Sequence, residues 1–283
     1  MSWRSDHAAV AVLSFDVDAE SPILAMGRQY AEHAMVMSHQ AYGPRVGVPR
    51  ILELLADLGV PGTFFVPGLT AERHPEAVGQ ILAGGHEIGH HSYAHVAPVD
   101  QTADEERRDF ERALAALAKL DVEPRGYRCP GWEPSYRTPA LVAEHGFAYD
   151  SSLFDDDRPY VLETRDGAIV ELPVSWELDD WEQYAFLPRP DIGTGLESPA
   201  KVLDLWTSAL DAYRRHGALF VLTCHPFLSG RPSRIETLRG LIEHALAAGD
   251  VEFRACGEVA AQVDGPRRKL EPVDVDEELY PEH

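Results

Sequence analysis

The chain has 283 residues, with 25 Lys and Arg against 47 Asp and Glu, so its formal net charge is −22. Nucleic acids and anionic membrane surfaces are therefore unexpected partners, because binding to them needs clustered positive charge. The longest apolar runs, residues 8–15 and 218–223, are too short to span a bilayer. Without a secretory-signal pattern at its start or cysteine spacing typical of a disulfide framework, the chain is expected to be reduced and cytoplasmic.

Short apolar runs typical of buried strands alternate with helical patterns along the chain. The expected strands are 8–15, 61–67, 86–90, 126–129, 148–150, 169–173, 218–224 and 251–254. The expected helices are 49–58, 75–83, 102–120, 139–145, 200–216 and 233–248. This alternation predicts a parallel sheet with right-handed crossovers, and about seven repeats favour a barrel over an open sheet.

Two parts of the chain do not follow this alternation. Residues 20–47 lack a clear period and are expected to form a long excursion. Residues 271–283 contain six acidic residues and no Lys or Arg, so we expect a solvated or partner-docked tail without catalytic chemistry. Residues 1–270 are expected to form a single barrel domain.

Charged and imidazole side chains follow directly after several predicted strands. Seven of them stand out by position: Asp16, Asp18, His91, His95, Arg128, Asp150 and His225. In a parallel α/β architecture, side chains that act on a ligand project from the carboxyl ends of the strands. A barrel would bring these residues together although they are far apart in the sequence.

The ends of the first and third predicted strands indicate a metal site. His91 and His95 are four residues apart, so on one helical turn they would share a face. Together with the Asp18 carboxylate they would leave positions open on a divalent cation for water and substrate. Zinc suits these ligands, and cobalt, nickel or iron would also fit. Asp16 would lie on the same side of the strand as Asp18 and could take a proton from the water.

Each of these residues also has a simpler structural interpretation. The Asp16 and Asp18 pair could cap a turn, and Asp150 could cap the turn that follows it. Arg128 could form a surface ion pair, and His225 could be a core histidine. Trp132, Trp176 and Trp181 are expected in the core or an interface rather than as sugar platforms.

Taken together, the motifs resemble the polysaccharide deacetylase family, the NodB-homology domain of carbohydrate esterase family 4. The resemblance rests on Ser14–Asp18, Gly62–Val66, Gly85–His95, Arg128–Gly131, Asp150–Ser152 and Leu222–Pro226, which occur in the family's order. It is closest to an intracellular branch of peptidoglycan-deacetylase-like proteins, because Asp16, Asp18 and Glu20 reproduce that branch's Asp-x-Asp-x-Glu pattern.

The resemblance implies a distorted (β/α)7 barrel and a role for each candidate residue. Asp18, His91 and His95 would bind the metal, and Asp16 would be the base, oriented by Arg128. His225 would be the acid, held by Asp150, while Glu20 would at most contact the substrate or support the site. Related proteins form symmetric assemblies, so a homo-oligomer is expected.

The function implied is metal-dependent hydrolysis of a C–N bond in a small-molecule or oligosaccharide substrate. N-deacetylation of an N-acetylated amino sugar, in peptidoglycan or a chitin-like oligomer, is the first hypothesis. The second is hydrolysis of a cyclic imide or ureide by an allantoinase-like enzyme, in which residues 21–47 would cover the site and favour small molecules. A non-catalytic sugar-binding barrel is a third, which the complete set of candidate residues disfavours.

Overall fold

The computed structural model describes Trp3 and residues 7–275, and each predicted strand has a counterpart in it. The strands are β1 (Ala9–Asp16), β2 (Thr63–Val66), β3 (Glu87–His90), β4 (Gly126–Tyr127), β5 (Tyr149–Asp150), β6 (Tyr160–Thr164), β7 (Gly167–Glu171), β8 (Leu219–Cys224), β9 (Val251–Phe253) and β10 (Arg267–Arg268). Within the described residues they form a ten-stranded sheet in the order β10-β6-β7-β5-β4-β3-β2-β1-β8, with β9 paired to β1.

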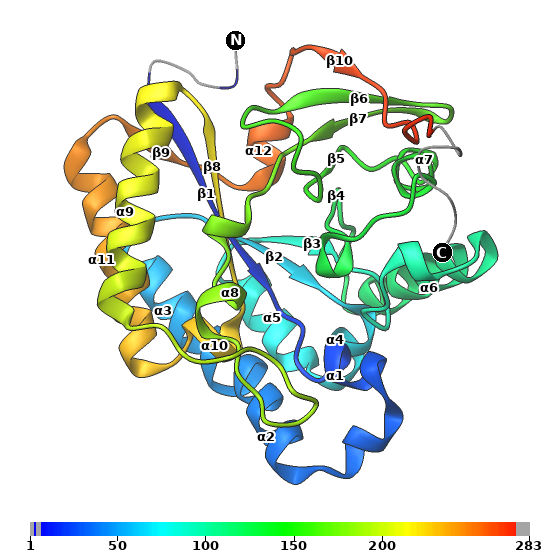
Figure 1. The fold of residues 1–283 in the computed structure, drawn as a ribbon, viewed down its shortest axis with the longest axis horizontal. Coiled ribbons are helices and arrows are strands. Elements are labelled where there is room, and N and C mark those ends of the chain that lie inside the picture. Colours follow the sequence, from blue (N-terminus) through cyan, green and yellow to red (C-terminus); the bar gives the residue numbers. More distant parts are fainter. Residues whose placement is uncertain (1–2, 4–6, 276–283) are drawn as a thin grey trace.

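The predicted helices are also present, and they pack around the strands. The helices are α1 (Ser21–Met26), α2 (Ala34–Tyr42), α3 (Val48–Leu58), α4 (Gly68–Arg73), α5 (Pro75–Ala83), α6 (Ala103–Ala118), α7 (Thr138–Glu144), α8 (Trp181–Tyr184), α9 (Pro199–His216), α10 (Pro226–Ser229), α11 (Pro232–Ala248) and α12 (Cys256–Ala260). In Figure 1, α9 and α11 lie on one side of the strands, and α6 and α7 lie on the opposite side. No helix of the described residues has the length and apolar character needed to cross a bilayer.

The sheet forms the predicted distorted barrel. Strands β8, β1, β2, β3, β4, β5 and β7 pair in parallel with one another in that order. After β7 the chain returns to β8, where Asp179 forms a parallel bridge with Thr223. The Asp180 amide donates to the Thr223 carbonyl at 3.1 Å. The segment after β7 therefore closes the barrel against β8. The same contact places residues 179–180 beside the carboxyl end of β8.

Strands β6 and β10 are not among the predicted elements. β6 pairs with β7 in an antiparallel hairpin, and β10 adds in parallel to the outer side of β6. β6 is only partly buried, and β10 has two residues, so neither carries a long apolar run. Pairing with β7, rather than sequence pattern, makes these segments extended.

The segment at 20–47 is the expected long excursion between β1 and α3, and it contains short helical elements that the sequence did not predict. It forms α1, a 3₁₀ turn at Arg28–Glu32, α2 and a π turn at Gly43–Gly47. These elements are short and change direction often, so no single helical period runs through them. A Cβ atom on Gly47 would lie 2.1 Å from the Pro226 carbonyl oxygen, so only glycine lets the π turn approach α10.

The main core lies between the strands and the surrounding helices. All eight residues of β1 are buried, and Phe15 stacks on Phe64 with ring centroids 4.8 Å apart. Helix α3 buries Ile51, Leu54 and Leu55 against them, as its predicted spacing requires. At the other end of the chain, residues 271–275 are exposed and have no regular secondary structure, and residues 276–283 of the predicted tail lie outside the described residues.

Candidate active site

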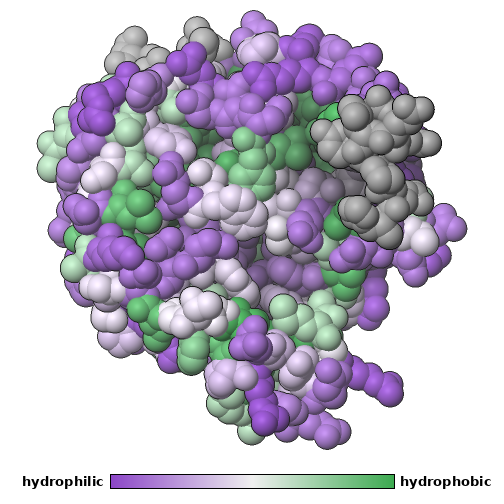
Figure 2. Space-filling view, in the orientation of Figure 1, coloured by the Kyte–Doolittle hydropathy of each residue, from purple (hydrophilic) through white to green (hydrophobic). Residues whose placement is uncertain are grey.

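The predicted site residues gather at the carboxyl ends of the barrel strands. A hollow of about 540 Å³ there is lined by Asp16, Asp18, His91, His95 and His225. The face seen in Figure 2 is hollowed near its centre, and hydrophilic residues predominate around its outer edge. The volume is in the range of roughly 300–1,000 Å³ that is typical of small-molecule sites.

Asp18, His91 and His95 form a compact group that could hold a metal ion. One ligand atom from each lies within 4.8 Å of the others. His91 Nε2 is 3.4 Å from Asp18 Oδ1, and His95 Nε2 is 3.4 Å from Asp18 Oδ2. One carboxylate and two imidazoles are a common donor set for a divalent cation with open positions.

The surroundings of these three side chains fit a cation. His91 Nδ1 donates to the Arg128 carbonyl at 2.8 Å, which leaves the lone pair on Nε2 directed at the group. Asp18 Oδ1 is buried and has no hydrogen-bond partner among the described residues. Burial opposes ionisation of Asp18, yet the imidazoles of His95 and His91 hold its pKa well below the usual value. The carboxylate therefore stays ionised, as a metal ligand must.

The expected helical turn at His91 and His95 is wrong. Residues 91–95 form an irregular loop in which Ser92 and His95 both adopt a φ of 57°. Asp109 on α6 holds this loop by accepting from the backbone amides of Tyr93 at 2.7 Å and Ala94 at 3.1 Å. Left-handed residues turn the two imidazoles toward one point, a geometry that four-residue spacing alone does not specify.

Asp16 is held in place by a buried arginine. Arg128 is completely buried, and its Nη1 donates to Asp16 Oδ1 at 2.9 Å and to Ser14 Oγ at 2.8 Å. The guanidinium also donates to the backbone oxygen and the hydroxyl of Ser151. The other carboxylate oxygen, Asp16 Oδ2, lies 3.9 Å from His91 Nε2. Arg128 is thus not a surface residue, and it leaves one oxygen of Asp16 facing the metal-ligand group.

His225 lies beside Asp18, one of the three candidate metal ligands. The prediction that Asp150 holds His225 is wrong. Asp180 accepts from His225 Nδ1 at 2.7 Å and from the His225 amide at 2.9 Å. Ser229 Oγ donates to the same carboxylate at 2.5 Å. Burial alone would lower the pKa of His225, but Asp180 and Asp179 raise it well above its usual value. His225 Nε2 faces inward, 3.6 Å from Asp18 Oδ2.

Asp150 instead supports the loop after its own strand. Its Oδ1 accepts from the Ser151 amide at 2.8 Å and from Ser152 Oγ at 2.5 Å, as a turn cap would. Asp150 pairs in register with Glu171 of β7, and burial raises its pKa to about 6. The sequence did not predict a role for Asp180, because the segment around it has no strand or helix periodicity. Its position next to Asp179 is the one feature of the sequence that could have drawn attention to it. The bridge to β8 brings it to His225.

Of the remaining candidate residues, the tryptophans line the hollow, whereas Glu20 does not. Trp132 lies in a hydrophobic core cluster and Trp181 packs against the main core, as expected, and both also line the hollow together with the exposed Trp176. Glu20 is buried away from the hollow, where it pairs with His74 at 2.8 Å and Arg73 at 3.4 Å. It joins the start of α1 to the carboxyl end of α4 rather than facing the site.

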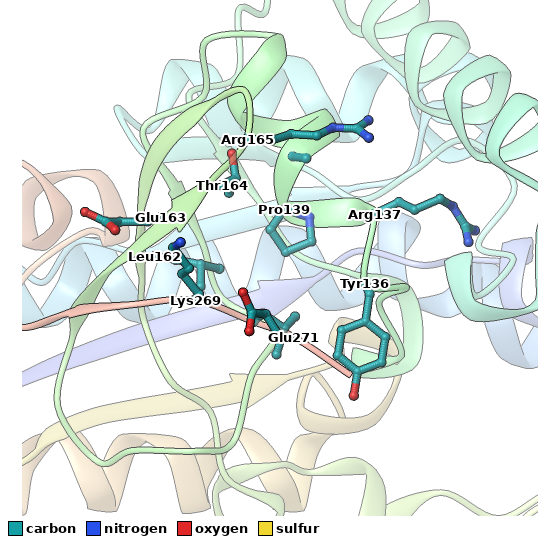
Figure 3. Close-up of a pocket in the computed structure, with 11 residues that line it drawn as sticks. Tyr136, Arg137, Pro139, Leu162, Glu163, Thr164, Arg165, Lys269 and Glu271 are labelled. Carbon is teal, nitrogen blue, oxygen red and sulfur yellow. The ribbon is translucent and has the colours of Figure 1, made fainter. Parts of the chain in front are cut away.

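A second hollow lies apart from these residues. It has a volume of about 360 Å³ and is bounded by the start of α7, by β6 and by residues 269–271 (Figure 3). Arg137, Arg165 and Lys269 alternate there with Glu163 and Glu271. Its lining includes none of the seven predicted site residues, so the chemistry is concentrated at the strand ends.

Comparison with known proteins agrees with the fold. The family model for polysaccharide deacetylase matches residues 33–149. The peptidoglycan deacetylase of Helicobacter pylori is 31% identical over 262 residues, which cover 82% of this chain and 89% of that protein. The crystal structure of a candidate polysaccharide deacetylase from Mycobacterium smegmatis is 48% identical and superposes with a TM-score of 0.94, covering 97% of this chain and 98% of that one.

The fold is also shared with an enzyme of different substrate. The structure of PuuE allantoinase is 23% identical and has a TM-score of 0.79 over 92% of this chain and 91% of that chain. The allantoinase likeness shows the fold alone, whereas the similarity to the Helicobacter pylori and Mycobacterium smegmatis proteins assigns the chain to one family. It belongs to the polysaccharide deacetylases, which hydrolyse C–N bonds other than peptide bonds.

Proposed function

We propose that this protein is a metal-dependent deacetylase that removes the acetyl group from an N-acetylated amino sugar in a peptidoglycan or chitin-like oligomer. The observation that carries the proposal is the arrangement of three groups in one hollow. A metal-ligand group lies between a carboxylate fixed by Arg128 and an imidazole fixed by Asp180. Amide hydrolysis needs this set, because water must lose a proton and the departing amine must gain one.

We infer that Asp18, His91 and His95 hold zinc, since two nitrogen donors and one carboxylate oxygen suit that ion. When bound there, the cation would polarise the amide carbonyl and make the attacking water more acidic. The peptidoglycan deacetylase of Helicobacter pylori, similar over most of this chain, supports the choice of an amino-sugar substrate.

Asp16 is proposed as the general base. Arg128 occupies Asp16 Oδ1, so Oδ2, which faces His91, is the oxygen that receives the proton from water. The buried guanidinium fixes the direction of the carboxylate. A positioned base of this kind typically contributes about 10²- to 10⁴-fold to the rate.

His225 is proposed as the general acid. Its Nδ1 proton is donated to Asp180, so Nε2 is the nitrogen that faces the hollow and can deliver a proton to the amine. Asp180 raises the pKa of His225, which keeps the imidazole protonated until the C–N bond breaks. Trp181, whose ring lies 5.4 Å from that of His225, covers this side of the site.

The proposal is tested by acetate release from oligomers of N-acetylglucosamine. The protein as purified is expected to release acetate. This activity should be lost after treatment with a chelator and should return when zinc is added. Asp18→Asn is expected to contain less metal by elemental analysis and to lose about 10²-fold or more of its activity. Full acetate release by the chelated protein or by Asp18→Asn would refute the metal-dependent mechanism.

A cyclic imide or ureide hydrolase is the second candidate, and one feature of the site favours it. Pro22, Ala25 and Met26 of α1 line the hollow, so the segment after β1 covers part of the site and limits its size. The allantoinase with the same fold makes a ureide ring a natural test compound. Turnover of allantoin or succinimide, with no acetate released from sugar oligomers, would establish this alternative.

A further inference from the structure

Two buried carboxyl groups on neighbouring strands have no part in the reaction proposed above. Asp150 on β5 and Glu171 on β7 are both completely buried, and they are partners in the parallel register of these strands. Asp150 Oδ1 accepts from the Ser151 amide at 2.8 Å and from Ser152 Oγ at 2.5 Å. Glu171 Oε1 accepts from the amides of Ser152 and Leu153, both at 2.9 Å. Both carboxyl groups therefore anchor the same short loop after β5.

The second oxygen of each carboxyl group lacks a partner. Asp150 Oδ2 and Glu171 Oε2 are buried, and neither has a hydrogen-bond partner among the described residues. Two ionised carboxylates side by side would repel each other, and each unpaired oxygen would lose hydrogen bonds to water that nothing replaces. One proton between the two oxygens removes both costs, since one group then donates and the other accepts.

The electrostatic surroundings favour a single proton on this pair. Burial raises the pKa of Glu171 well above its usual value, and the charge of Asp150 raises it further. Burial also raises the pKa of Asp150, but hydrogen bonds from Ser152 and Ser151 and the charge of Arg128 limit the rise to about 6. At neutral pH, Glu171 therefore carries the proton and Asp150 carries the negative charge.

The loop that this pair anchors holds the buried arginine of the active site. Ser151 accepts from the Arg128 guanidinium with its backbone oxygen at 3.2 Å and with its hydroxyl oxygen at 3.0 Å. Ser152 Oγ accepts from the amide of Cys129, the residue after Arg128, at 2.9 Å. The loop thus fixes both the side chain and the backbone of Arg128, whose guanidinium in turn holds Asp16 Oδ1.

We propose that Asp150 and Glu171 share one proton and act as positioning residues for the general base. The pair fixes the loop, the loop fixes Arg128, and Arg128 fixes the direction of the Asp16 carboxylate. This inference rests on the proposed function, in which Asp16 takes a proton from water. Proton transfer depends steeply on the position of the accepting oxygen, so a shift of the loop lowers the rate even when the reacting groups are all present.

The hydrogen bonds from the loop dictate what amide replacements can do. In Asp150→Asn or Glu171→Gln the amide oxygen must face the loop, where it accepts, so the NH2 group faces the other carboxyl group. Each single variant keeps one donor opposite one acceptor, whereas in the double variant two NH2 groups face each other. We expect kcat for acetate release to fall about threefold in each single variant and about 100-fold in the double variant, roughly tenfold beyond the product of the two. KM should change little, because the substrate contacts are intact.

Infrared spectroscopy detects the proton without turnover. A protonated carboxyl group has a carbonyl stretch that ionised carboxylates lack, and both single variants are expected to lose such a band from the wild-type spectrum at neutral pH. Glu163→Gln on β6 is the matched control, since Glu163 already forms an ion pair with Arg267 at 3.1 Å, and it should keep the band. If the double variant does not fold, Ser151→Ala replaces it, because losing one contact to Arg128 should lower kcat about tenfold.

The outcomes separate the two parts of this inference from the proposed function. A folded double variant that loses no more than the product of the singles would overturn the shared proton, as would a band that is absent from wild type or persists in both single variants. A lower melting temperature with unchanged kcat, in the double variant or in Ser151→Ala, would overturn the positioning role, because a purely structural pair affects stability alone. A wild-type protein with the band that releases no acetate would support the shared proton and contradict the deacetylase proposal.

Discussion

Replacing Asp180 with Asn tests the part of the site that the structure corrected. Asp180 is completely buried and accepts hydrogen bonds from His225 Nδ1, the His225 amide and Ser229 Oγ. Asn has the same size but is uncharged, and its amide nitrogen cannot accept. His225 would keep its place in the fold while losing the charge that holds its proton and orients its ring.

The size of the effect follows from that contact. A hydrogen bond to a charged group contributes about 1.5–3 kcal/mol, and the 2.7 Å distance to Nδ1 places this one among the strong cases. If the contact is fully used when the amine departs, its loss raises the barrier by about 3 kcal/mol. The expected result is a decrease of about 10²-fold in kcat, with little change in KM.

The assay measures kcat and KM for acetate release, with the melting temperature of each variant recorded as a check on folding. Asp179→Asn is the matched control. Asp179 Oδ1 lies 3.6 Å from His225 Nδ1, beyond hydrogen-bond distance, and it accepts from the Trp181 amide at 2.9 Å, a contact that the side-chain oxygen of Asn keeps. We expect its kcat to stay within about threefold of wild type. Normal kcat in Asp180→Asn, with a large loss in a folded Asp150→Asn, would refute the assignment and restore the pairing predicted from sequence.

Two further predictions concern buried basic residues. Arg128→Lys keeps a positive charge, but an ammonium group cannot make the guanidinium hydrogen bonds to Asp16, Ser14 and Ser151. Calorimetry should therefore show a loss of about 2–4 kcal/mol in the free energy of unfolding. An unchanged melting temperature would contradict this prediction. Burial lowers the pKa of His90 to about 3. Below pH 6.5 this histidine is protonated in the unfolded chain but stays neutral in the folded protein. As the pH falls from 6.5 to 3, His90 therefore lowers the free energy of unfolding by up to about 1.4 kcal/mol per pH unit. In urea denaturation at a series of pH values, the free energy of unfolding of His90→Gln should fall less steeply with decreasing pH than that of the wild type. Equal slopes for the two proteins would disprove this explanation.

Local patterns were sufficient for most of the barrel. Strand β1 is an uninterrupted apolar run and helix α3 has its apolar residues on one face, so both were predicted to within a residue or two. Because parallel strands carry their carboxyl ends to one rim, the sequence also predicted that Asp18, His91 and His95 would meet. Here the periodicity of buried side chains specifies structure directly.

Other features depend on contacts between distant segments. The loop at 91–95 is shaped by Asp109 on another element, and β6 is extended because it pairs with β7. The order of residues along the chain does not show whether Asp150 or Asp180 is the carboxylate that accepts from His225. The bridge from residue 179 to Thr223 decides between them. Hydrophobic periodicity reports which side chains are buried, but the partner of a buried charge is set by how the barrel closes.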